Sequence, residues 1–127
     1  MAFEYGENAV LEVEIEGTKY LGTVDNADII DFWANNSEEL QRLSKLTTDI
    51  GDEEVANSMR EFVSLVVGFT AALLGPEAAQ RVFNGRERSL LFCVALMDYL
   101  NSEIESQGLF ERLEAASRKY SAAKVIG

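Results

Sequence analysis

The residue types that most often carry catalysis are nearly absent from this chain of 127 residues. It contains no histidine and a single cysteine, Cys93. Ser-His and Cys-His nucleophilic centres use histidine, the commonest general base, so its absence excludes them. Zinc sites need several cysteines or histidines, which the chain also lacks. The composition therefore predicts a protein that is not an enzyme and that holds no cofactor.

Two residues that could form a site on their own are more typical of a core. Cys93 lies inside the apolar run Leu90 to Leu96. Without a histidine to activate it, a thiol in such a run usually behaves as a small buried hydrophobe. Trp33, the one tryptophan, is more typical of a core anchor than of a platform on which a ligand stacks.

Carboxylates are the remaining groups with chemical potential. Asp25, Asp28 and Asp31 form the tightest acidic cluster. An EF-hand loop places its first ligands at every second position and has a glycine at its sharp turn. The three aspartates are spaced three residues apart and have no such glycine, so they do not fit an EF-hand. Capping of a helix and a solvated helix face fit the three aspartates better. We therefore predict no metal site.

The formal net charge of -11 is concentrated in the first half of the chain. Residues 1–54 hold fourteen acids and three bases, whereas residues 55–127 hold eight of each. Such a field repels phosphate backbones and anionic lipid, so we expect neither nucleic acid nor a membrane as partner. One basic cluster near the C-terminus is diluted by acids and is more typical of a solvated helix face. It comprises Arg112, Arg118, Lys119 and Lys124.

The length fits a single domain over residues 1–127. Residues 1–5 lack the positive region and the apolar stretch of a signal peptide, so we expect a cytoplasmic protein. The longest apolar segment, residues 62–74, is interrupted by polar residues and is shorter than the roughly 18 apolar residues of a membrane span. It predicts a core helix.

Residues 9–23 alternate between apolar and acidic side chains, which predicts a β-hairpin with one buried face. A tight turn at Glu16-Gly17 would pair Glu14 with Lys19 and Val13 with Tyr20. In this register Leu21 falls on the acidic face, among Glu12, Glu14 and Glu16. We therefore expect another element or another chain to cover part of that face, and Leu21 is a candidate partner-binding residue.

Apolar residues at helical spacing predict that residues 26–123 form four or five helices packed on the hairpin. Residues 26–50 fit either one long helix or two helices broken at residues 35–37, with Asn36 capping the second. Gly75-Pro76, Asn84-Gly85 and Gly108 separate the later helices. The fold class is mainly α, a hairpin followed by a compact helical bundle.

The apolar stripes of residues 62–74 and 90–100 are wider than a small bundle easily covers. A homo-oligomer and a well-packed monomer both fit this pattern.

The segment Glu14–Tyr20, an amphipathic helix, and Leu73–Gly85 leading into a second long helix resemble small proteins of phage and prophage tail modules. Among these, the tail assembly chaperones of long-tailed phages are the similar family, over roughly residues 9–106. The resemblance implies a non-enzymatic protein in the host cytoplasm. It would bind hydrophobic helices of a tape-measure or other tail protein, in a groove lined by Trp33, Phe62, Phe69 and Phe92.

Two other functions stay open. A small acidic regulator or inhibitor would mask a basic protein partner with residues 25–54. An enzyme that uses carboxylates and a metal is the remaining hypothesis, which the missing histidine disfavours.

Overall fold

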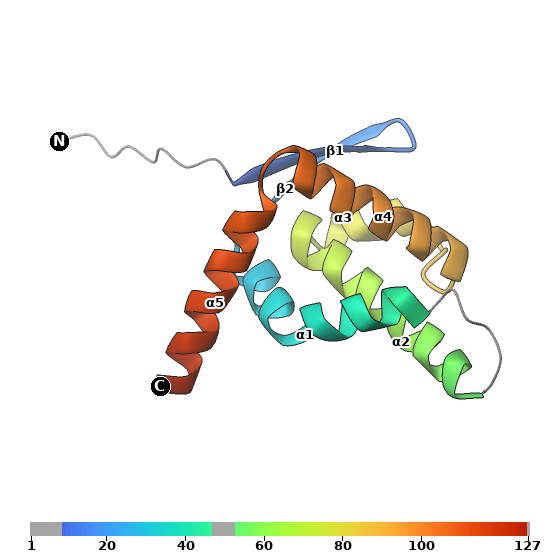
Figure 1. Cartoon of the computed structure of the whole chain (residues 1–127). Coiled ribbons are helices and arrows are strands. Elements are labelled where there is room, and N and C mark those ends of the chain that lie inside the picture. Colours follow the sequence, from blue (N-terminus) through green and yellow to red (C-terminus); the bar gives the residue numbers. More distant parts are fainter. Residues whose placement is uncertain (1–8, 47–52, 127) are drawn as a thin grey trace.

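The computed structural model describes residues 9–46 and 53–126, with side chains over residues 9–44 and 56–121 (Figure 1). A two-stranded antiparallel hairpin precedes five helices in the described chain, so the predicted mainly α fold class is confirmed. The elements are β1 (Val10–Ile15), β2 (Thr18–Thr23), α1 (Ala27–Leu46), α2 (Glu53–Leu74), α3 (Pro76–Phe83), α4 (Leu90–Ser106) and α5 (Phe110–Ile126).

The hairpin has the register that the alternation predicts. Glu14 lies opposite Lys19, and Val13 lies opposite Tyr20. The turn residues Glu16 and Gly17 both have positive φ, 50° and 84°, as a tight two-residue hairpin turn requires. Leu11, Val13 and Ile15 are buried against the helices, whereas the alternate side chains face outward.

The outer edge of β1 is closed by one side chain of α4 and by the residue that directly follows α4. The amide side chain of Gln107, which follows α4, accepts from the backbone N–H of Glu12 (3.1 Å) and donates to the carbonyl of Glu12 (2.7 Å). The hydroxyl of Tyr99 accepts from the N–H of Glu14 (2.9 Å). Because unpaired strand edges need partners, these contacts explain why the hairpin lies along α4, as Figure 1 shows (blue beside orange).

The open question about residues 26–50 is answered by α1, which is one helix from Ala27 to Leu46. The amide of Asn35 donates to the carbonyl of Asp31 (2.9 Å), and the amide of Asn36 donates to the carbonyl of Phe32 (3.0 Å). These side chains bond backward along the helix instead of capping a new one. Residues 47–50 lie outside the described residues.

Asn26 joins three elements at one point. Its Oδ1 accepts from the N–H of Ile29 (2.9 Å) and so caps the N-terminus of α1. Its Nδ2 donates to the carbonyl of Thr23 at the end of β2 (3.2 Å) and to the carbonyl of Ala72 near the end of α2 (3.1 Å). The Ala72 bond links residues 46 positions apart in the chain.

The helix α2 is central, since it contacts α1, α3, α4 and β2. Its last turn approaches β2 so closely that a Cβ at Gly22 would lie 2.7 Å from the carbonyl oxygen of Leu73. Gly68 permits a similar approach by the ring of Phe32 in α1. Small residues at these two crossings set the distance between the packed elements.

The shorter elements begin and end where the sequence predicts. Pro76 opens α3, and Asn84, in the left-handed conformation, closes it. The hydroxyl of Ser89 accepts from the N–H of Phe92 and caps α4. The helix α5 runs beside α1 (red and cyan in Figure 1), and its Leu113 is buried in the core.

Within the described residues, no helix combines the length and the apolar character needed to cross a membrane.

Replacing Asn26 with aspartate should lower the free energy of unfolding by about 2–3 kcal/mol, because the carboxylate keeps the helix cap but loses two donors and faces two carbonyl oxygens. Urea denaturation followed by circular dichroism measures the change. The matched control is Asn57→Asp, since the Oδ1 of Asn57 only accepts from Arg60 on an exposed helix face. Equal losses in both variants would contradict the assigned role of Asn26.

Candidate functional site

Three of the aromatic residues that the resemblance placed in a groove lie in the core instead. Trp33, Phe62 and Phe69 are each at most 2% exposed. The ring of Trp33 packs against Phe69 (5.8 Å between centroids) and edge-on against Phe110 (5.7 Å). Its indole N–H donates to Glu114 (3.2 Å). This cluster holds α1, α2 and α5 together, so the role that the contacts show for Trp33 and Phe69 is packing of the core.

Phe92 is half-buried and already has partners on two sides. Its ring meets the edge of Phe83 (5.6 Å between centroids), and the guanidinium of Arg86 lies 3.9 Å from its centroid. Arg86 also forms an ion pair with Glu16 at the hairpin turn. The hydrogen bond from Arg86 holds the pKa of the Glu16 carboxyl below its usual range. Phe92 therefore supports a structural link between the hairpin turn and α4.

Leu21 is the predicted site residue that the structure leaves on the surface. It lies opposite Glu12 on the outer face of the hairpin and is 67% exposed. No described element of the chain covers it, so cover by another chain remains a prediction.

Two of the three aspartates near the start of α1 make surface hydrogen bonds, and the helix cap itself is Asn26. The carboxylate of Asp25 accepts from the hydroxyl of Thr23. Asp31 accepts from the amide of Asn35 (3.0 Å) and from the hydroxyl of Tyr120 (2.7 Å), and the latter bond raises the pKa of Tyr120. Over the described residues, no three acidic, cysteine or histidine side chains come together as metal ligands.

Cys93 is fully buried in α4, as the apolar run predicts. Burial raises the pKa of its thiol to about 11. A thiol that stays protonated near neutral pH is a poor nucleophile.

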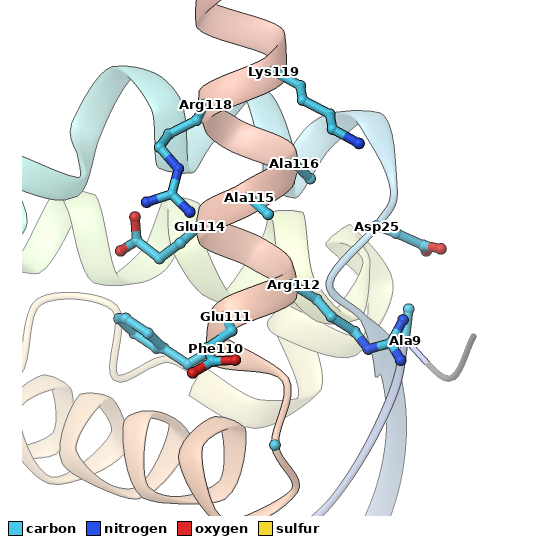
Figure 2. Close-up of a pocket in the computed structure, with 11 residues that line it drawn as sticks. Ala9, Asp25, Phe110, Glu111, Arg112, Glu114, Ala115, Ala116, Arg118 and Lys119 are labelled. Atoms are coloured by element: carbon cyan, nitrogen blue, oxygen red, sulfur yellow. The ribbon is translucent and has the colours of Figure 1, made fainter.

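Basic and acidic side chains alternate around a hollow of about 980 Å³ beside α5. Figure 2 shows Arg112 and Lys119 on the side of α5 nearer to Ala9 and Asp25, whereas Glu114 and Arg118 point to the other side of the helix. Mixed charge of this kind suits a solvated helix face better than a phosphate-binding surface. The side chain of Lys124, the fourth member of the basic cluster, lies outside the described side chains.

A second hollow has a different character. About 650 Å³ lies open between α2 and the beginning of α4, with a largely apolar floor of Met59, Val63 and Leu90. We call it the α2–α4 groove. Charged side chains of both signs form its rim, Arg60, Glu87 and Arg88, and Ser64 completes the lining.

Apolar character continues past the groove. The next residue after Leu90 in α4, Leu91, is 82% exposed. The sequence carries a signal for this surface in the width of the two apolar stripes, whereas Trp33, Phe62 and Phe69, which the resemblance implied for a groove, are buried. The α2–α4 groove can bind a row of apolar side chains, such as the apolar face of an amphipathic helix.

Replacing Phe69 with alanine should lower the free energy of unfolding by about 3–5 kcal/mol, because a fully buried ring is lost. Leu91→Ala should change it by less than about 0.5 kcal/mol, because the side chain is exposed. Thermal and urea denaturation of the two variants provide the comparison. Similar effects at the two positions would contradict the assignment of core and surface.

The buried thiol should not react with Ellman's reagent at pH 8 until the protein unfolds. Because the pKa of Cys93 is about 11 in the folded chain against an ordinary value of 9.0, the unfolded chain loses this proton first as the pH rises. The contribution of Cys93 to stability should therefore fall between about pH 9 and pH 11. The free energy of unfolding, measured by urea titration, should fall more steeply with pH over this range in the wild type than in Cys93→Ala. The same slope in both proteins would contradict the raised pKa of Cys93.

The chain belongs to the family of unknown function DUF6673, which it matches over residues 16–125. Comparison with curated proteins gave no match. Comparison with solved structures gave none either.

Proposed function

We propose that this protein is a non-enzymatic binding protein that holds an amphipathic helix of a partner protein in the α2–α4 groove. The observation that carries the proposal is the apolar floor of Met59, Val63 and Leu90, open to solvent between two helices. Grooves between helices accept the apolar face of a third helix, whose side chains at every third and fourth position fill the floor.

The rim of the groove suits such an occupant. Arg60 and Arg88 offer positive charge, and Glu87 offers negative charge, so both signs on the polar flanks of a helix find a partner. The floor supplies affinity and the rim supplies orientation. The three side chains of the floor are half-buried, and Val63 and Leu90 pack against the core, so the groove is present before the partner arrives.

The partner that we propose is a hydrophobic helix of a phage tape-measure or other tail protein, as for the tail assembly chaperones that the sequence resembles. An apolar helix of this kind aggregates in water before assembly. The net charge of -11, which residues 1–54 carry in the sequence, would keep the complex in solution.

A second candidate is an acidic regulator that masks a basic protein. Exposed carboxylates on the hairpin and α1 favour it, among them Glu12, Asp28 and Glu38. None of these three forms an ion pair with a described residue. This function would use the opposite half of the chain from the α2–α4 groove, so the two candidates make different predictions for the same variants.

The test is co-purification with a tape-measure fragment from the same genome, measured by size-exclusion chromatography with light scattering. Ser64→Glu places a charge in the α2–α4 groove and should weaken the complex by at least about tenfold. The matched control Ser102→Glu makes the same change on an exposed face of α4 outside the groove and should leave the complex intact.

Failure of the wild-type protein to co-elute with the fragment would contradict the chaperone function. A complex that is insensitive to Ser64→Glu but is lost in Asp28→Asn/Glu38→Gln would instead favour the acidic regulator.

A further inference from the structure

The two edges of the hairpin differ in how their backbone groups are satisfied. Gln107 and Tyr99 close the edge of β1. Glu12 and Glu14, whose N–H groups make these bonds, lie opposite Leu21 and Lys19 in β2. Along a strand of an antiparallel pair, the backbone N–H and C=O groups of one residue bond to the partner strand, and those of the next residue point away from it. The N–H and C=O groups of Lys19 and Leu21 therefore point away from β1, at the edge of β2.

No described residue bonds to these groups of Lys19 and Leu21. At the end of the same edge, the carbonyl of Thr23 accepts from Asn26, so the unpaired stretch is short and has a defined end. An unpaired strand edge beside an apolar surface is a template for adding a further strand.

The surface beside this edge is hollowed and partly apolar. A hollow of about 500 Å³ follows β2 and is lined on its far side by the last turn of α2, including Ala71 and Leu74. Leu21 and Val10 border it from the hairpin and are 67% and 49% exposed. An extended segment laid along β2 would cover the exposed side chain of Leu21.

The charge around the edge selects the occupant. Residues 9–31 contain six acidic residues and one basic residue, Lys19. Asp28 lines the hollow and forms no ion pair with a described residue. A second copy of this chain would bring the same negative charge to the edge, whereas a segment with lysine or arginine would neutralise it.

We propose that the free edge of β2 binds an extended segment of a partner protein, in which alternate apolar residues are flanked by lysine or arginine. The segment adds as a third strand to the hairpin through the backbone of Lys19 and Leu21. This surface is separate from the α2–α4 groove and goes beyond the helix-binding function, so either can fail without the other.

Two synthetic peptides test the proposal, Lys-Val-Thr-Val-Thr-Val-Lys and its counterpart with glutamate in place of both lysines. Amide exchange of the full-length protein is followed by NMR. At millimolar concentration, the lysine peptide should slow exchange of the Lys19 and Leu21 amides by at least about tenfold, and the glutamate peptide should not.

A proline at position 21 sharpens the test, because it removes only an N–H that points away from β1. Leu21→Pro should weaken binding of the lysine peptide by at least about tenfold, whereas the control Leu21→Val, which keeps the N–H, should change it by less than about threefold. Circular dichroism confirms folding of each variant. If Leu21→Pro does not fold, the exchange experiment on the wild-type protein decides.

Three results would overturn the proposal. The first is unchanged exchange of both amides with the lysine peptide, and the second is equal protection by the two peptides. The third is protection in the absence of peptide that rises with protein concentration, which would assign the edge to a second copy of this chain.

Discussion

The side chain of Asn26 is the point on which the arrangement of the hairpin and the first two helices depends. Its oxygen caps α1, and its N–H groups donate to the carbonyl of Thr23 at the end of β2 and to the carbonyl of Ala72 in the last turn of α2. Both donors of the amide and its oxygen are used, so no other residue type of similar size can replace it. Since α2 contacts four other elements, fixing its end against β2 also fixes where the remaining helices can pack.

Close packing around this junction decides which apolar residues remain available to a partner. Gly22 and Gly68 let α2 approach β2 and α1, and the aromatic rings of Trp33 and Phe69 fill the space between α1, α2 and α5. The largest apolar side chains are therefore used internally. Exposed apolar surface is left at the margins, in the α2–α4 groove and beside β2.

The charge asymmetry of the sequence has a counterpart in these two surfaces. The α2–α4 groove lies in the electrically balanced half of the chain and has a rim of both signs. The edge of β2 lies in the acidic half, beside Asp28. Both surfaces have an apolar part, but their charges differ, so they suit different segments: an amphipathic helix for the first and a basic extended segment for the second.

The amino-acid pattern alone predicted the hairpin with its register, most of the helix boundaries and the burial of Cys93, because alternation, helix caps and apolar runs act over a few residues. It did not decide whether residues 35–37 break α1, since asparagine can cap a helix or bond backward within one. Nor could it separate Trp33 and Phe69 in the core from Leu90 and Leu91 at the surface. That distinction depends on which helix faces meet, and only the packing of distant segments settles it.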